Sequence, residues 1–276
     1  MKFSVLMSIY DKENPTFFDQ SIDSIIKQTL KPTEIVIVKD GPINSGLDNI
    51  IIKYTKLYPG LLKIVNLEKN VGLGEALRIG LSYCSNEIIA RMDTDDICLS
   101  NRFERQIPLI IKDKSIAVLG SWIAEFENDP KRVKAIKEVP LSYEDIKKKA
   151  RYRNPLNHMS VVFRKSLVEA VGSYQSFYLN EDYYLWARLL LNGYKIININ
   201  DVLVLVRAGD NLYARRGGIN YIKNEIKLQS FFLKSGFTSK RQFFYNIIIR
   251  SFVHLVPNKV RKIIYKKLLR RSPAKV

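Results

Sequence analysis

Three carboxylates follow a short apolar run near the middle of the first two hundred residues. Residues 88–92 read Ile-Ile-Ala-Arg-Met, and Asp93, Asp95 and Asp96 come after them. Such a run is typical of a strand buried on both faces of a parallel sheet, and ligands bind at the carboxyl edge of open α/β sheets. If the chain stays extended, Asp93 and Asp95 point to one side and offer Mg²⁺ or Mn²⁺ the oxygen ligands that these ions prefer. A turn ending in an aspartate N-cap would give the same pattern, so the motif alone leaves both interpretations open.

A further acidic residue ends another predicted strand. Residues 34–39 are mostly β-branched, and Asp40 follows them before a Gly-Pro turn. An acidic side chain at this place in a nucleotide-binding sheet accepts hydrogen bonds from a ribose or base, and the alternative is an ordinary turn residue. The loop at residues 70–74 lacks both the dinucleotide fingerprint and the Lys-Ser/Thr of a P-loop. Arg78, in the helix predicted next, either reaches toward a diphosphate or lies on a solvated helix face.

A pair of acids, Glu181 and Asp182, opens a later predicted helix. Acids in a first helical turn offset the helix macrodipole, and Asn180 is a good N-cap. A carboxylate held at a rigid helix start can also act as a general base toward an acceptor hydroxyl. His158, at the start of a predicted strand, is either a metal or acceptor contact or a satisfied structural group.

An α/β fold with a mostly parallel central sheet flanked by helices would position these residues, because apolar patterns of strand and helix type alternate along the chain. Pro108 should kink or end its helix. Residues 127–153 are polar and basic and predict a surface loop and helix near the acceptor side. We expect strands at residues 3–9, 34–40, 62–67, 88–92, 116–123, 157–164 and 202–206, and helices at 17–28, 48–58, 75–84, 101–112 and 181–191.

Composition narrows the class of protein. The chain has 276 residues, a net charge of +18 and 46% hydrophobic residues, which is enough for one large α/β domain with an appendage. No secretory signal or apolar run of about 20 residues is evident. Cys84 and Cys98 fit neither a disulfide framework nor a zinc spacing, so we expect reduced thiols in a cytoplasmic protein. The positive charge is compatible with nucleic acid, anionic lipid or an anionic substrate.

Five segments together resemble the family 2 glycosyltransferases, and the resemblance covers about residues 3–210. It implies the GT-A fold, a nucleotide-diphospho-sugar donor and a divalent metal, Mn²⁺ or Mg²⁺. The pattern is most similar to bacterial enzymes that extend O-antigen or exopolysaccharide units, whose acceptors are usually lipid-linked saccharides. The segments are residues 7–10 (Met-Ser-Ile-Tyr), 35–41 (Ile-Val-Ile-Val-Lys-Asp-Gly), 70–74 (Asn-Val-Gly-Leu-Gly), 91–96 (Arg-Met-Asp-Thr-Asp-Asp) and 181–186 (Glu-Asp-Tyr-Tyr-Leu-Trp).

The resemblance also implies roles for single residues. Asp93 and Asp95 match the Asp-x-Asp motif that contacts ribose and metal, and Asp96 would extend the motif or cap the helix starting near Leu99. Asp182 would be the general base of an inverting transfer, with Glu181 binding or orienting the acceptor. The residues implied at the nucleotide are Ser8, Tyr10 and Glu13, which would line the base and ribose, and Asp40, which would bind the uracil or its equivalent.

Two basic segments complete the expectations. Arg215 and Arg216 lie in a glycine-containing loop that either closes over the donor diphosphate or forms a basic surface turn. No acid follows Glu225, so the domain division is a catalytic unit at 1–218 and basic amphipathic helices at 219–276. These helices favour an anionic bilayer surface, with packing on the catalytic domain as the alternative. We therefore expect a cytoplasmic enzyme peripheral on the inner face of the cell membrane.

Other classes of protein fit the sequence less well. A nucleic-acid-binding protein would spread basic and aromatic residues over one face, whereas the basic excess here gathers at the end of the chain, so nucleic acid is not an expected partner. A nucleotidyltransferase would need a Gly-rich, Lys/Arg-bearing loop after the first strand, which residues 8–11 do not provide. A catalytically dead relative would not need Asp182.

Overall fold

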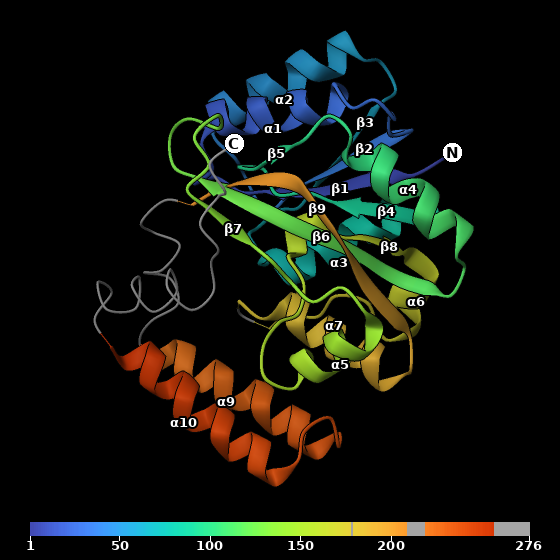
Figure 1. Cartoon of the computed structure of the whole chain (residues 1–276). Coiled ribbons are helices and arrows are strands. Elements are labelled where there is room, and N and C mark those ends of the chain that lie inside the picture. The colour runs from blue at the N-terminus through green and yellow to red at the C-terminus, as the bar shows by residue number, and fades with distance from the viewer. Residues whose placement is uncertain (178, 209–218, 257–276) are drawn as a thin grey trace.

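One sheet of nine strands organises the computed structural model, which describes residues 1–177, 179–208 and 219–256 (Figure 1). The strand order is β3-β2-β1-β4-β8-β6-β9-β5, and β7 pairs with β6 at the side. The strands are β1 (Ser4–Ile9), β2 (Glu34–Lys39), β3 (Leu62–Asn66), β4 (Ile88–Arg91), β5 (Ile97–Cys98), β6 (Ile116–Phe126), β7 (Ala135–Lys137), β8 (Val162–Arg164) and β9 (Lys195–Arg207).

The sheet is parallel in its first half and mixed in its second. β1 pairs in parallel with β2 and β4, and β2 with β3, as the alternating pattern predicts. β8 then runs antiparallel to both β4 and β6, while β6 and β9 are parallel. The parallel half therefore carries the ends of β1, β2 and β4 to a common edge, which is where the candidate residues were expected.

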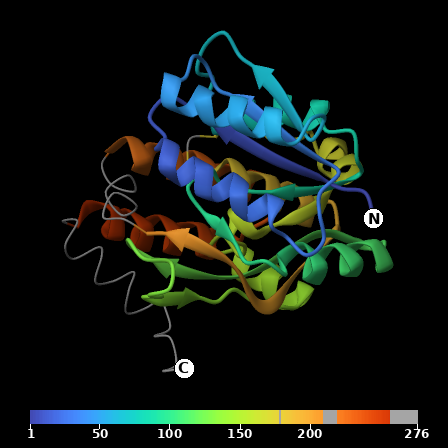
Figure 2. The same ribbon diagram turned by 90° about the horizontal axis from the view of Figure 1, so that it is seen from above.

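Helices cover both faces of the sheet (Figures 1 and 2). Alternate residues of each strand face opposite layers: Val5 and Met7 of β1 pack in the cluster with α1 and α4, whereas Leu6 packs in the cluster with α3 and α7. The helices are α1 (Pro15–Ile26), α2 (Ser45–Leu57), α3 (Leu73–Tyr83), α4 (Arg102–Lys112), α5 (Tyr143–Ala150), α6 (Lys165–Ala170), α7 (Glu181–Leu191), α9 (Ile219–Lys234) and α10 (Lys240–Leu255), with a 3₁₀ turn η1 at His158–Ser160.

The predicted elements are largely confirmed, with differences where side-chain patterns are short or interrupted. Every predicted helix and strand overlaps an observed one, but β5, β7 and α6 were not predicted, and residues 158–160 form a 3₁₀ turn before β8. β9 begins at Lys195, seven residues before the strand predicted at 202–206. Pro108 does not end its helix, because α4 continues through it to Lys112.

The C-terminal helices pack on the rest of the chain. Leu228 and Phe232 of α9 are fully buried and belong to the same cluster as α3 and α7. Arg250 of α10 pairs with Glu225 of α9 and donates to the carbonyl of Tyr152, Nη2 to O 2.6 Å. α9 therefore packs on the catalytic unit, which is the alternative that the sequence left open. Among the described helices, none is long and apolar enough to cross a membrane.

Both cysteines are buried free thiols, as expected for reduced residues. Burial raises the pKa of Cys84 to about 12, and burial likewise raises the pKa of Cys98. Neither thiol has the exposure and lowered pKa of a reactive cysteine.

Candidate functional site

The three aspartates occupy the loop between β4 and β5. Carboxylate oxygens of Asp93, Asp95 and Asp96 all lie within 4.8 Å of one another. Asp96 is buried and accepts a hydrogen bond from the backbone N–H of Arg207 at 3.0 Å. It does not cap a helix, because α4 begins at Arg102 and β5 intervenes; the N-cap interpretation of Asp96 is wrong.

The grouping of these carboxylates fits a divalent cation. Burial raises the pKa of Asp96 well above its usual value, and the charges of Asp95 and Asp93 raise it further. Three acids this close repel one another unless a cation lies among them, and hard oxygen ligands are those that Mn²⁺ and Mg²⁺ prefer. The donor set therefore fits the expected metal.

Arg91 is a buried cation directly behind this loop. Only 2% of the residue is exposed, and its guanidinium forms an ion pair with Asp93. Burial alone would lower the pKa of Arg91, but the neighbouring carboxylate of Asp93 raises it, so the side chain stays charged. Its Nε and Nη1 groups have no hydrogen-bond partner within residues 1–177, 179–208 and 219–256.

The acid pair at the start of α7 lies near the same cation. Asp182 accepts a hydrogen bond from the side chain of Asn154, Nδ2 to Oδ2 2.6 Å. Burial raises the pKa of Asp182, while Asn154 and then the positive charges of Lys137 and Arg91 oppose the rise. Burial and the charge of Asp182 raise the pKa of Glu181 to about 7. The charge of Arg91 acts on both acids, and the charge of Asp93 acts on Glu181, so the start of α7 lies near the aspartate loop.

The start of α7 is held firmly. The hydroxyl of Tyr183 donates to the carbonyl of Ala150, at the end of α5, at 2.6 Å. Tyr183 also packs edge-on against Phe232 of α9, with ring centroids 5.0 Å apart. These contacts fix the helix that presents Asp182.

Asp40 fixes a neighbouring loop. Its two carboxylate oxygens accept the backbone N–H groups of Val71 and Gly72 at 2.7 and 3.1 Å. A Cβ on Gly41 would lie 2.7 Å from the nitrogen of Asn70, so the two segments touch backbone to backbone. Asp40 thus holds the loop at residues 71–72 in place, and its contact with a uracil stays a prediction.

Ser8, Tyr10 and Glu13 lie at the carboxyl end of β1, in the expected place. Ser8 pairs in register with Val38 of β2, and the N–H of Glu13 donates to the carbonyl of Tyr10 at 3.1 Å in the turn that follows. Since β1 runs parallel to β2 and β4, this turn is at the same edge as Asp40 and the aspartate loop. Their contact with a nucleotide remains a prediction.

Two other candidates lie apart from the aspartates. Arg78 is exposed and pairs with Glu75 one turn earlier on α3, which matches the solvated-face interpretation.

His158 is buried, and its Nε2 shares a hydrogen bond with the hydroxyl of Tyr174 at 2.9 Å. Burial, and then the charge of Arg91, lower its pKa well below the usual value. In the described part of the chain, the acidic residues grouped closely enough to hold a metal ion are Asp93, Asp95 and Asp96, and His158 is not among them. Its buried, hydrogen-bonded ring matches the interpretation of a structural histidine. Arg215 and Arg216 lie outside the described residues.

Three site residues were missed in the sequence. Arg91 was visible as a charge inside an apolar strand, an unusual place that requires a partner. Arg207 ends β9, and its guanidinium centre lies 3.7 and 4.7 Å from the ring centroids of Phe17 and Phe126. Asn154 gave no local pattern at all, because its partner Asp182 is 28 residues away.

A sheet with an Asp-x-Asp group at its carboxyl edge and a carboxylate pair near it is typical of a glycosyltransferase of the GT-A fold. The family model described as "Glycosyl transferase family 2" matches residues 4–171. The chain belongs to this family.

Similar proteins agree with this assignment. The amylovoran biosynthesis glycosyltransferase AmsE of Erwinia amylovora is 43% identical over 96% of this chain and 98% of its own length. A UDP-Gal:alpha-D-GlcNAc-diphosphoundecaprenol beta-1,3-galactosyltransferase of Escherichia coli is 42% identical over 98% of this chain and 97% of its own length. The solved structure of a Pyrobaculum calidifontis mannosyltransferase in complex with GDP-Man and Mn²⁺ covers 94% of this chain and 71% of that chain, with a TM-score of 0.65. At 16% identity that structure supports the fold alone.

Proposed function

We propose that this family 2 glycosyltransferase moves a hexose from a UDP-sugar to a hydroxyl of a saccharide carried on a lipid diphosphate, with inversion at the anomeric carbon. The observation that carries the proposal is that two acidic groups share the charge of Arg91: its guanidinium pairs with Asp93, and its positive charge stabilises the ionised form of Asp182. By their names, one of the two relatives acts in amylovoran biosynthesis and the other transfers galactose from UDP-Gal to alpha-D-GlcNAc-diphosphoundecaprenol. Family membership favours this activity over the nucleic-acid-binding and nucleotidyltransferase alternatives.

The donor side of the site consists of the edge formed by β1, β2 and β4. Ser8, Tyr10 and Glu13 would contact the base and ribose, and Asp40 would position the loop beside them. Asp93 and Asp95 would hold a Mn²⁺ or Mg²⁺ ion, which supplies positive charge to the leaving diphosphate. Closure of Arg215 and Arg216 over the donor belongs to the same proposal, and an unchanged donor turnover in Arg215→Ala would contradict it.

On the acceptor side, Asp182 takes the proton of the attacking hydroxyl. Asn154 donates to one of its oxygens and thereby orients the carboxylate. The raised pKa brings the base closer to neutral pH, where proton transfer is more favourable. The hydroxyl oxygen forms a bond to the anomeric carbon as the bond to the diphosphate breaks, and one displacement of this kind inverts the anomeric configuration.

The proposed place of work is the inner face of the cell membrane, on the cytoplasmic side. α10 exposes large apolar side chains, with Phe244, Ile248 and Phe252 each more than 60% exposed. This face, together with the basic residues of the chain's end, fits an anionic bilayer that contains the lipid-linked acceptor.

Donor hydrolysis tests the proposal most directly. UDP-, GDP- and dTDP-sugars are offered with Mn²⁺ or with a chelator to the wild type and to Asp95→Asn and Asp182→Asn. We expect metal-dependent UDP release from the wild type and none from either variant. A nucleotide-binding titration beside it should show binding lost in Asp95→Asn and retained in Asp182→Asn. A wild-type protein that binds none of these nucleotides would overturn the proposed function.

A further inference from the structure

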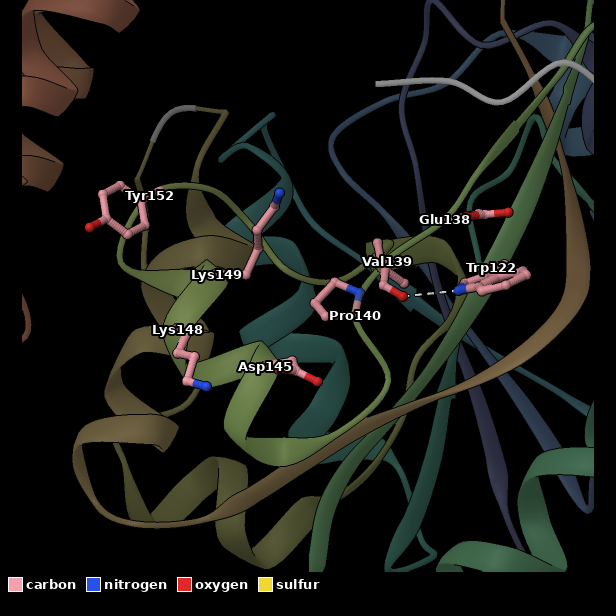
Figure 3. A pocket seen from close by; sticks show the side chains of 8 residues that line it. All are labelled: Trp122, Glu138, Val139, Pro140, Asp145, Lys148, Lys149 and Tyr152. Atoms are coloured by element: carbon pink, nitrogen blue, oxygen red, sulfur yellow. Dashed lines mark hydrogen bonds between the residues drawn. The ribbon is translucent and has the colours of Figure 1, made fainter. Parts of the chain in front are cut away.

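A pocket outside the carboxylate site opens between β6 and α5 (Figure 3). Its volume is about 540 Å³, and Trp122 and Tyr152 lie on opposite sides of it, with Lys148 and Lys149 of α5 between them. Neither the Asp-x-Asp motif nor the acid pair of α7 contributes to its lining.

The pocket adjoins the catalytic base. Tyr152 is two residues before Asn154, whose side chain holds Asp182. Glu138, which also lines the pocket, follows Lys137, whose charge lowers the pKa of Asp182. Both segments that lead out of the pocket therefore end beside the carboxylate that receives the acceptor's proton.

The aromatic walls are positioned by the fold. The pairing of β6 with β9 shifts register on both sides of Trp122, and such irregularities re-aim side chains. The indole N–H donates to the carbonyl of Val139 at 2.9 Å, which fixes the ring in the wall of the pocket. Tyr152 packs edge-on against Tyr245 of α10, with ring centroids 6.0 Å apart. Fixed aromatic rings provide flat apolar surface for the carbon face of a sugar.

The lining carries two lysines, Lys148 and Lys149, and two acids, Glu138 and Asp145, and the segment that surrounds it is basic. Residues 131–153 contain nine basic and three acidic side chains. Of the acids in the lining, Asp145 accepts the hydroxyl of Ser142 at the start of α5. Lys148 and Lys149 are exposed on the last turn of the same helix, so their ammonium groups are available to a ligand that enters from solvent.

We propose that this pocket binds the sugar-diphosphate end of a lipid-linked acceptor. Lys148 and Lys149 bind the diphosphate, Trp122 and Tyr152 hold the sugar, and the target hydroxyl reaches Asp182. The lipid chain leaves along α10, which touches Tyr152 through Tyr245 and exposes its apolar side chains beyond. The inference rests on the proposed function for the identity of the acceptor, but the pocket's preference for an alkyl diphosphate can be measured independently.

Tryptophan fluorescence provides the measurement. The chain has two tryptophans, and Trp186 is fully buried in the core, so a ligand in this pocket should change the emission of Trp122. Farnesyl diphosphate is titrated into the full chain with UDP and Mn²⁺ already saturating the donor site, and farnesol serves as the uncharged probe. Trp122→Phe, which should lose the signal, identifies the reporter.

The decisive comparison is between two lysine pairs. Lys148→Ala with Lys149→Ala should raise the dissociation constant for farnesyl diphosphate about tenfold, the factor that two exposed ion pairs of ordinary strength give together. Lys112→Ala with Lys114→Ala, which removes the same charge near the end of α4, should leave it unchanged. Farnesol should bind at least about tenfold more weakly than the diphosphate.

The outcomes separate the two proposals. Equal weakening by both lysine pairs, equal binding of farnesol, or no signal from Trp122 would overturn the pocket assignment. If UDP itself fails to bind, the proposed function fails, and the titration repeated in chelator still decides whether the pocket takes an alkyl diphosphate. With an accepted sugar-diphosphate-lipid, Lys148→Ala with Lys149→Ala should raise KM for the acceptor and leave KM for the donor unchanged.

Discussion

At the scale of single residues, the buried positive charge of Arg91 interacts with several acids of the site. Its guanidinium pairs with Asp93, stabilises the charged forms of Glu181 and Asp182, and lowers the pKa of His158. A buried cation among several acids allows more than one of them to remain ionised. Burial therefore favours the neutral form of Asp182, and the hydrogen bond from Asn154 and the nearby cations favour its charged form.

Removing the hydrogen bond from Asn154 should change the pH dependence of transfer. In Asn154→Ala the charged form of Asp182 loses a donor, so its pKa rises and the acidic limb of kcat/KM moves to higher pH by about one unit, the equivalent of one hydrogen bond to a charged group. A pH-rate profile from pH 4 to 9 measures the shift. Asn101→Ala, at an exposed site before α4, is the control, and an acidic limb that stays in place would contradict the role given to Asn154.

Glu181 should destabilise the folded chain at neutral pH. Its pKa rises from 4.5 to about 7 on folding, so the folded state keeps a proton that the unfolded state releases, and stability falls as pH rises through this interval. Glu181→Gln should raise the free energy of unfolding by about 3 kcal/mol at pH 8 and by less than about 1 kcal/mol at pH 5. Urea unfolding at both pH values measures the gain. An equal gain at both pH values would show that the carboxylate's charge is not the cause, and exposed Glu169→Gln is the control.

The residues predicted from the sequence are those whose role follows from their own neighbours. The alternation in Asp93-Thr94-Asp95 and the place of Asp182 at a helix start were visible along the chain. Asn154 and Arg207 were not, because their partners lie 28 and 111 residues away and only the folded chain brings them together. Asp40 was found in the right place, but its contacts with the loop at residues 71–72 could not be foreseen from its strand.

At the scale of elements, the end of β9 supports the aspartate loop. The N–H of Arg207 holds Asp96, its Nε donates to the carbonyl of Asp95 at 3.3 Å, and its Nη2 donates to Gln20 at 2.7 Å. The sequence predicted this strand only from residue 202, since Asn198, Asn200 and Asp201 interrupt the apolar pattern. In the structure β9 continues through these residues, and its pairing with β6 shifts register there.

Arg207→Ala should weaken the metal-dependent donor site without unfolding the chain. Its side chain supports the backbone of Asp95 rather than contacting a ligand, and loss of such supporting contacts typically weakens metal binding about tenfold or more. Calorimetric titration of UDP in the presence of Mn²⁺ measures the effect. Arg105→Ala removes an exposed ion pair to Asp201 on the same strand and should bind UDP as the wild type does. Equal affinity in the two variants would exclude this role for Arg207.

The outer face of α10 is the second element-scale feature. Its exposed apolar side chains lie at helical spacing, and replacing Phe244, Ile248 and Phe252 with Gln should weaken binding to vesicles containing anionic lipid by roughly tenfold or more. Vesicle co-sedimentation measures this, with Ile52→Gln and Leu57→Gln on exposed positions of α2 as the matched control. Retained vesicle binding in the α10 variant would remove this face from the membrane contact.

At the scale of the whole molecule, the C-terminal helices and the catalytic unit share a core. The sequence divided the chain at residue 218 because the charge pattern changes there, and a composition change of this kind cannot show that α9 fills the space beside α7. Leu228, Phe232 and Phe237 belong to the same buried cluster as residues of α7, and Asn246 of α10 donates to the carbonyl of Arg151 at 2.8 Å. Tyr245 of α10 also packs against Tyr152, which lines the proposed acceptor pocket.

A chain of residues 1–218 should therefore be less stable than one of residues 1–256. Deleting residues 219–256 removes the buried side chains of Leu228, Phe232 and Phe237 from the core, and their burial together stabilises the fold by roughly 5 kcal/mol. Thermal unfolding and size-exclusion chromatography of both chains measure the loss. An independent catalytic unit would give the shorter chain the same melting temperature, and that result would contradict the shared core.

The buried state of both thiols makes the chain a convenient target for site-directed labelling. Cys84 and Cys98 are the two cysteines of the sequence, and neither offers a maleimide an accessible thiolate at neutral pH. A cysteine introduced at exposed Lys240 would thus be modified selectively without first removing the native thiols. A fluorophore or spin label attached there would report the environment of α10 in an otherwise unaltered enzyme.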